Sequence, residues 1–315
     1  MLKIIDLGLE LPQSTDEIEK KIRSVFLDKD TRGMANYRRI FGPRWAAAMG
    51  TTLEEIDAKR KELTEAEFTS LLASIAEMLT VTPEVFIKEL DQAGIEWGLV
   101  DSDDIDKTAK FVRRWPERFK GMALINPFDG MKAVRELERA VRELGLVAFY
   151  ASPFDWKIRA NDALFYPLYA KAAELNIPVF IYTAMNYNTE LPMDLARPLY
   201  LDGVAMAFPE LKIVADCGGW PWVPEMIGVA RRHQNVFIDT SSNRPKHLTT
   251  PGSGWEMLLQ FGNSLLQDQV VFASGAGDLG LPIGLIVEEM KSLPLKEEVK
   301  EKWLYKNAQR LFELE

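Results

Sequence analysis

Short apolar runs alternate with amphipathic segments along most of this chain. In the amphipathic segments over 131–144 and 165–175, apolar residues recur at i, i+3, i+4 and i+7, which predicts helices that bury one face. A short apolar run rich in β-branched and aromatic residues predicts a strand that is buried on both faces, as in parallel sheets. The runs predict eight strands, over 2–9, 97–100, 121–126, 146–151, 178–183, 211–216, 236–240 and 269–274.

The alternation of strands and helices predicts an α/β protein with a parallel sheet. Eight strands are the number that closes a (β/α)₈ TIM barrel, and barrels of this kind reach the 315 residues of this chain. An open doubly wound sheet also alternates, but it usually has fewer strands and a glycine-rich phosphate turn, which does not follow the first strand here. We therefore expect one barrel domain over 1–315.

One long segment, over 12–82, interrupts this alternation directly after the first strand. It is charged and helical in pattern, and it begins on the face where barrels build their active sites. A functional interpretation makes it a lid or a partner-binding arm, which its aromatic and basic run over 37–45 favours. The alternative is a surface insertion, since long loops add little closure entropy.

Composition and charge narrow the classes of function. The net charge of −9 and the isoelectric point near 5.1 argue against nucleic acids and anionic membranes as partners. The chain contains no apolar run of membrane-spanning length and no signal-peptide pattern, so we expect a cytoplasmic protein without membrane association. Its single cysteine excludes an internal disulfide, and only two histidines are present to act as zinc ligands or acid/base groups.

Five ordered motifs carry a resemblance to a known family. The chain resembles the amidohydrolase branch that contains aminocarboxymuconate-semialdehyde decarboxylase and the resorcylate-type decarboxylases. The resemblance implies a TIM barrel, metal-dependent hydrolase or decarboxylase chemistry and oligomer formation. The motifs are Asn161–Tyr169 leading into Ile177–Thr183, Phe208–Val214 followed by Gly218 and Gly219, Asn235–Ser241, and Asn307–Leu311.

The resemblance also implies metal ligands, and the positions expected to supply them have changed. In the family, the first strand ends in an Asp-x-His-x-His pattern. This chain retains Asp6 but has Gly8 and Glu10 at the two histidine positions.

Three further positions that the resemblance marks as metal ligands differ as well. Tyr182 and Cys217 stand where the fifth and sixth strands end in histidine, and Gly275 stands where the eighth ends in aspartate. Glycine offers no donor, and a phenol that loses its proton near pH 10 binds divalent metals poorly at neutral pH. We therefore predict no bound metal and no other cofactor.

Glu10 and Tyr182 are the candidate catalytic residues, because the resemblance points both into the former metal cavity. A carboxyl and a phenol in a shielded pocket can act as an acid/base pair. The alternative is a hydrogen-bonded pair that only fills the cavity. Cys217 is a possible nucleophile, but a buried free cysteine is usually an apolar filler.

The candidate substrate-binding residues follow the sixth and seventh strands. Arg244 and His247 lie in a basic loop that suits a substrate carboxylate, although a solvated surface loop has the same composition. Trp220, near Trp222, lines either a pocket for an organic acid or, together with Trp255, a subunit interface.

Two principal functions fit these observations. The first is a non-catalytic or accessory subunit that pairs with a metal-bearing paralogue acting on small carboxylic acids, or that forms a homodimer. The second is a metal-independent decarboxylase or hydrolase of a small organic acid that uses Glu10 and Tyr182. A third hypothesis is an altered metal site built from Glu10, Asp216, Asp278 and His247.

Overall fold

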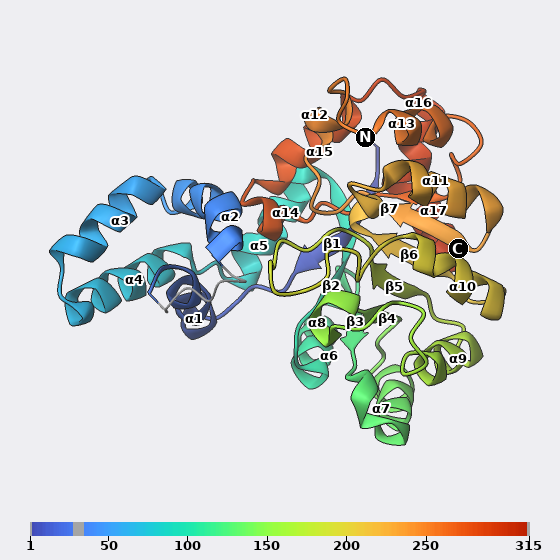
Figure 1. Ribbon diagram of the computed structural model, residues 1–315, viewed down its shortest axis with the longest axis horizontal. Coiled ribbons are helices and arrows are strands. Elements are labelled where there is room, and N and C mark those ends of the chain that lie inside the picture. Colours follow the sequence, from blue (N-terminus) through green and yellow to red (C-terminus); the bar gives the residue numbers. More distant parts are fainter. Residues whose placement is uncertain (1, 28–34, 314–315) are drawn as a thin grey trace. The chain divides into compact units, whose positions relative to one another are not determined.

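The computed structural model describes residues 2–27 and 35–313. Eight parallel strands pair in chain order, each with the next, and helices surround them (Figure 1). This arrangement confirms the predicted barrel, and each predicted strand overlaps an observed one. The strands are β1 (Ile4–Glu10), β2 (Ile95–Asp101), β3 (Phe119–Leu124), β4 (Ala148–Ala151), β5 (Val179–Tyr182), β6 (Ile213–Asp216), β7 (Val236–Asp239) and β8 (Val270–Val271).

Backbone hydrogen bonds connect the last strand to the first, so the barrel is nearly closed. The amide of Leu7 donates to the carbonyl of Phe272 at 3.0 Å, and the amide of Gly275 donates to the carbonyl of Gly8 at 3.1 Å. The pairing of β1 with β2 shifts register between Asp6 and Leu9, as a β-bulge does.

The barrel helices pack one apolar stripe against the strands. In α7 this stripe consists of Ala133, Val134, Leu137 and Ala140, and both predicted helices are observed with slightly shorter bounds. The longer helices are α6 (Ile105–Arg114), α7 (Met131–Arg142), α9 (Tyr166–Glu174), α10 (Leu199–Ala207), α11 (Val223–Arg232), α13 (Glu256–Gly262) and α15 (Ile283–Lys291). The short ones are α8 (Pro153–Trp156), α12 (Pro245–Leu248), α14 (Ala276–Leu279), α16 (Glu297–Glu301) and α17 (Asn307–Leu311), with single turns η1 (Pro127–Asp129), η2 (Cys217–Gly219) and η3 (Lys302–Lys306).

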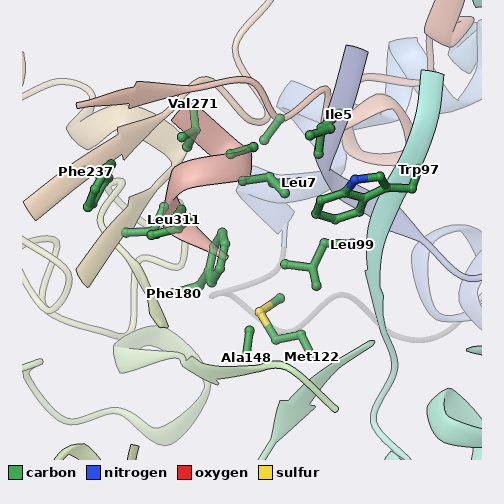
Figure 2. Close-up of a cluster of buried hydrophobic side chains, with 13 residues drawn as sticks. Ile5, Leu7, Trp97, Leu99, Met122, Ala148, Phe180, Phe237, Val271 and Leu311 are labelled. Atoms are coloured by element: carbon green, nitrogen blue, oxygen red, sulfur yellow. The ribbon is translucent and has the colours of Figure 1, made fainter. Parts of the chain in front are cut away.

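An apolar layer fills the interior of the barrel. Figure 2 shows side chains from several strands pointing toward one another, with Leu311 of α17 among them. All of the cluster's buried members are less than 10% exposed, which is the close packing that stabilises a barrel core. They are Ile5, Leu7, Trp97, Leu99, Met122, Ala148, Phe180, Val214, Phe237, Val271, Ala273, Ala308 and Leu311.

A second compact unit consists of Pro12–Glu89 and Tyr187–Met193, and the rest of the chain forms the barrel unit. The predicted insertion over 12–82 overlaps the second unit, and its residues 28–34 lie outside the described residues. Its helices are α1 (Thr15–Phe26), α2 (Ala35–Ala48), α3 (Leu53–Glu62) and α4 (Glu65–Leu79), and α5 (Pro83–Ala93) leads from it into the barrel unit.

The second unit has its own helix starts and its own core. Ser14, Thr52 and Thr64 each cap a helix and are paired with a glutamate three residues later. Phe26 and Phe68 are buried in a separate apolar cluster. Over the described residues, no single helix is long and apolar enough to cross a membrane, and α4 and α5 pass that test only together, as a bent pair.

Candidate active site

A polar layer lies above the apolar layer, at the carboxyl ends of four strands. Alternate residues of a strand face the same side, so a residue two positions beyond an interior apolar side chain also faces inward. TIM barrels build their active sites at this end of the strands. The pairs of interior and polar residues are Leu99 and Asp101, Ala148 and Tyr150, Val214 and Asp216, and Phe237 and Asp239.

Asp216, the last residue of β6, accepts hydrogen bonds from two neighbours. The Tyr150 hydroxyl donates to its Oδ2 at 2.9 Å, and the Ser241 hydroxyl lies 2.7 Å from its Oδ1. Burial and the charge of Asp216 raise the pKa of Tyr150 well above its ordinary value, so this phenol keeps its proton at neutral pH.

Asp239, the last residue of β7, is buried, with 1% of its surface exposed. Its Oδ1 accepts from the amides of Cys217 at 2.9 Å and Ser241 at 3.0 Å, and it lies 2.7 Å from the Ser241 hydroxyl oxygen. Burial and the charge of Asp216 raise the pKa of Asp239 well above its ordinary value. Asp216 and Asp239 thus lie on either side of one hydroxyl.

Asp101, the last residue of β2, is half-buried among other carboxylates. Its pKa is raised from its ordinary value near 3.8 to about 7, with burial as the largest cause. The other causes are the negative charges of Asp216, Glu10 and Asp278. A carboxyl group that titrates near pH 7 in this position is suited to general acid/base catalysis.

The structure places the two predicted catalytic residues at different strand ends. Glu10 ends β1, pairs in register with Asp101 and lies so close to Gly277 that a Cβ there would be 2.6 Å from its carboxyl carbon. Tyr182 ends β5, donates to the carbonyl oxygen of Met185 at 3.3 Å and packs near the ring of Phe154. Glu10 therefore belongs to the carboxylate group around Asp101, and the Tyr182 hydroxyl bonds to backbone.

The positions that the family uses for metal do not fit a metal here. Gly8 and Gly275 have no side-chain donor, and an added Cβ at Gly275 would lie 2.3 Å from the amide nitrogen of Ser242, which leaves no room for a side chain there. An added Cβ at Gly8 would make a tight contact of 3.0 Å with the Cβ of Ala273. Burial and two neighbouring carboxylates raise the pKa of the Cys217 thiol well above its ordinary value, so it is not a thiolate donor.

An altered metal site was the third hypothesis from the sequence. In the part of the chain that the structure describes, no three histidine, cysteine, aspartate or glutamate side chains are grouped so as to hold a metal ion. The altered site proposed from Glu10, Asp216, Asp278 and His247 is therefore not formed. Asp278 instead accepts a hydrogen bond from the Ser242 hydroxyl at 2.6 Å, and His247 is exposed on α12.

Two of the predicted substrate-binding residues, Arg244 and Trp220, bond to other residues of the chain. The Arg244 guanidinium forms a two-pronged ion pair with Glu289 of α15, with Nε 2.9 Å from Oε1 and 3.0 Å from Oε2. Trp220 donates its indole N–H to the carbonyl of Ser253 at 3.3 Å. Trp255 is only 4% exposed, so its side chain has little surface left for a partner chain, and the subunit interface stays a prediction.

Sequence reasoning missed Asp101, Tyr150, Asp239 and Ser241 as site residues. The signal was present in the period of two along each strand, since Leu99 and Ala148 face inward and Asp101 and Tyr150 follow two residues later. Asp101 and Tyr150 lie on the second and fourth strands, where the resemblance marks no metal position.

The amidohydrolase family model matches residues 93–314. The chain is 32% identical over 83 residues to γ-resorcylate decarboxylase of Polaromonas sp., covering 24% of this chain and 26% of that protein. It is 27% identical over 129 residues to 2-keto-4-carboxy-3-hexenedioate hydratase of Sphingobium sp., covering 35% of this chain and 38% of that protein. The matched segments thus span about a quarter and well over a third of these relatives.

Two solved structures share the fold over the whole chain. An uncharacterised TIM-barrel protein of Bordetella bronchiseptica superposes with a TM-score of 0.70 and 24% identity over 99% of both chains. The 5-carboxyvanillate decarboxylase of Sphingomonas paucimobilis superposes with a TM-score of 0.66 and 18% identity over 100% of both chains. At these identities the likeness shows the barrel and not the activity.

Proposed function

Because this chain belongs to the amidohydrolase family, we propose that it decarboxylates a small organic acid at the mouth of its barrel without the family's metal, with Asp101 as the proton donor. The match to the family model bears out the resemblance in the sequence. The activity is our proposal.

One observation carries the proposal: the Asp101 carboxyl stands at the carboxyl end of β2, in the layer where barrels perform chemistry, near the charges of Glu10, Asp216 and Asp278. Burial and these charges raise the pKa of Asp101 to about 7. In decarboxylation the bond from carbon to the carboxylate breaks, and its electron pair stays on the carbon. The proton of Asp101 then bonds to that carbon, carbon dioxide leaves, and a proton from water restores Asp101. General acid catalysis of this kind typically contributes about 10²–10⁴-fold to the rate.

The charge of the site agrees with a proton donor that is neutral when the substrate binds. Glu10, Asp216 and Asp278 raise the pKa of Asp101 by their negative charge, and ionised Asp101 would repel a substrate carboxylate. Protonation of Asp101 removes one of these charges and supplies the transferred proton at the same time. Tyr150 keeps its hydroxyl proton and, held by Asp216, fixes one side of the mouth.

The names of two relatives agree with proton transfer to carbon. A decarboxylase replaces a carboxylate by a proton, and a hydratase adds water across a carbon–carbon double bond with a proton transferred to carbon. Both names therefore support a role for a carboxyl group with a near-neutral pKa. Hydration is an alternative outcome of the same assay.

An accessory subunit is the second candidate function. It is favoured by Gly8 and Gly275, which offer no side-chain donor, and by the lack of room for a side chain at Gly275. The exposed apolar residues of α10, Leu199 at 50% and Met206 at 60%, are available to a partner chain. On this proposal the barrel pairs with a metal-bearing paralogue, or with a second copy, and has no turnover of its own.

The test is an assay of the pure chain after dialysis against a chelator. The panel contains γ-resorcylate, 5-carboxyvanillate and 2-keto-4-carboxy-3-hexenedioate, and the readouts are carbon dioxide release and loss of substrate absorbance. We expect turnover by wild type, a loss of about 100-fold or more in Asp101→Asn, and no loss in Asp103→Asn, a matched exposed carboxylate.

Two outcomes would overturn the proposal. Equal rates in Asp101→Asn and wild type would exclude Asp101 as the proton donor. Turnover that appears only after a metal-bearing paralogue is added, and that Asp101→Asn leaves unchanged, would establish the accessory subunit instead.

A further inference from the structure

The Ser241 hydroxyl lies between two carboxyl groups at hydrogen-bond distance from both. Its Oγ is 2.7 Å from Oδ1 of Asp216 and 2.7 Å from Oδ1 of Asp239. A serine hydroxyl has one proton and therefore donates one hydrogen bond. With both carboxyls ionised, one of these oxygen–oxygen contacts would have no proton in it and would be repulsive.

We propose that Asp216 and Asp239 share a single proton through Ser241, so that the pair carries one negative charge at neutral pH. The protonated carboxyl group donates a hydrogen bond to the Ser241 oxygen, and the Ser241 hydroxyl donates its own hydrogen bond to the other, ionised carboxyl group. Two carboxylates that share a site in this way titrate as a pair.

The surroundings of the pair support this assignment independently. Ser241 is 4% exposed and Asp239 is 1% exposed, so water does not replace the missing proton. The Cys217 amide donates both to Oδ1 of Asp239 and to the Ser241 hydroxyl, at 2.9 and 3.0 Å. These donors compensate one negative charge, and an isolated second charge at this depth is costly.

The charged and titratable groups that face the pair come from four other elements, β2, β4, η2 and α14. Tyr150 of β4 donates to Asp216, and the charge of Asp216 contributes to raising the pKa of Asp101 of β2. Cys217 keeps its thiol proton, and Asp278 of α14 adds a further negative charge nearby. The charge of the pair therefore determines how strongly the mouth holds a proton on Asp101.

This inference rests on the proposed function only where Asp101 is concerned, and it makes Ser241 and Asp239 positioning residues. If the pair held two negative charges instead of one, Asp101 would bind its proton more tightly. The shared proton thus keeps the pKa of Asp101 near neutrality.

Infrared spectroscopy of the whole chain at pH 8 tests the shared proton directly, through the carbonyl stretch of protonated carboxyl groups. Asp101 is mostly ionised at this pH. Among the residues that the structure describes, Asp6 is the other buried carboxyl besides Asp239, and burial raises its pKa. We expect a band that remains in Asp6→Asn, disappears in Asp239→Asn and shifts in Ser241→Ala. Ser241→Thr, which keeps the hydroxyl, restores it.

The pH dependence of turnover is the second readout. Because the pair carries one negative charge, Asp239→Asn, which leaves that charge on Asp216, should leave the titration of Asp101 near its wild-type pH. A pair with two negative charges would lose one of them in this variant, and the titration of Asp101 would move to lower pH. A pH 8 spectrum of wild type without any protonated carboxyl would overturn the shared proton. A band with the predicted behaviour in a chain that turns over no substrate would keep this inference and remove the proposed function.

Discussion

Two layers of the same barrel interior differ in almost every physical respect, although two residues separate them along each strand. The lower layer consists of apolar side chains such as Leu99, Phe180 and Phe237 that are nearly inaccessible to water. The upper layer consists of groups such as Asp101 and Asp239 that ionise or share protons. The comparison shows how a barrel separates its stability from its chemistry within about 7 Å of strand, at roughly 3.3 Å per residue.

The difference has an energetic consequence. Burial of an apolar side chain stabilises the fold, whereas burial of a carboxyl group costs free energy unless the group is protonated or hydrogen-bonded. Truncation of an apolar side chain in the lower layer should therefore lower the free energy of unfolding, whereas removal of the Asp101 charge from the upper layer should raise it. The predictions below test this contrast, beginning with the largest effect.

Phe180→Ala removes a large side chain from the lower layer, where Phe180 is 1% exposed. We expect a loss of about 3–5 kcal/mol in the free energy of unfolding, because such truncations leave a cavity. Denaturant unfolding at pH 7 measures it. Met206→Ala on α10, which is 60% exposed, is the control and should change stability by less than about 0.5 kcal/mol. Equal losses in the two variants would contradict the placement of Phe180 in the core.

The lower layer and the strands that carry it could be predicted from the sequence. The apolar runs are local signals, and each lies within a few residues of the strand observed, as 178–183 lies over Val179–Tyr182. The barrel followed because eight such runs close on themselves. The eighth strand is shorter than predicted, because only Val270 and Val271 pair regularly. Phe272 and Gly275 bond to β1 outside a regular ladder.

The upper layer could be predicted only in part. Glu10 lies at the carboxyl end of β1, a strand that the sequence predicted, and its catalytic role stays a prediction. The partnership of Ser241 with Asp216 and Asp239 depends on residues up to 25 positions apart meeting at one hydroxyl, which no local pattern encodes. Arg244 had a suitable residue type, but its choice of Glu289, 45 residues away, is likewise set by tertiary structure.

Gly275→Ala tests the side of the mouth where the family's metal ligand is missing. Gly275 has a positive φ of 55°, and an added Cβ would lie 2.3 Å from the Ser242 amide. We expect a loss of about 2–4 kcal/mol, from left-handed strain of roughly 1–2 kcal/mol and from overpacking.

Gly254→Ala is the matched control for this glycine. Its φ of 89° is also positive, but nothing lies within 4 Å of the added Cβ, so only the backbone strain remains. Calorimetry of both variants measures the difference. If Gly275→Ala lost no more stability than Gly254→Ala, the mouth would have room for a side chain at position 275, and a metal ligand there would be sterically possible.

Asp101→Asn should have the smallest effect on stability and the opposite sign. The pKa of Asp101 is about 7 in the folded chain and near 3.8 when the side chain is free in solution. Between these values the folded chain holds a proton that the unfolded chain has released, so stability falls as pH rises from about 4 to about 7. Below that window the residue costs nothing, and above it the cost is constant.

The substitution removes this cost, because asparagine has no charge to bury. At pH 8 we expect Asp101→Asn to be more stable than wild type by on the order of 1–2 kcal/mol, less than the full shift of roughly 1.4 kcal/mol per pH unit because the side chain is half-buried. At pH 4 the two should be equal, and Asp103→Asn should match wild type at pH 8. Thermal unfolding at both pH values measures this, and a destabilised Asp101→Asn at pH 8 would mean that the carboxylate of Asp101 contributes to holding the barrel together as the lower layer does.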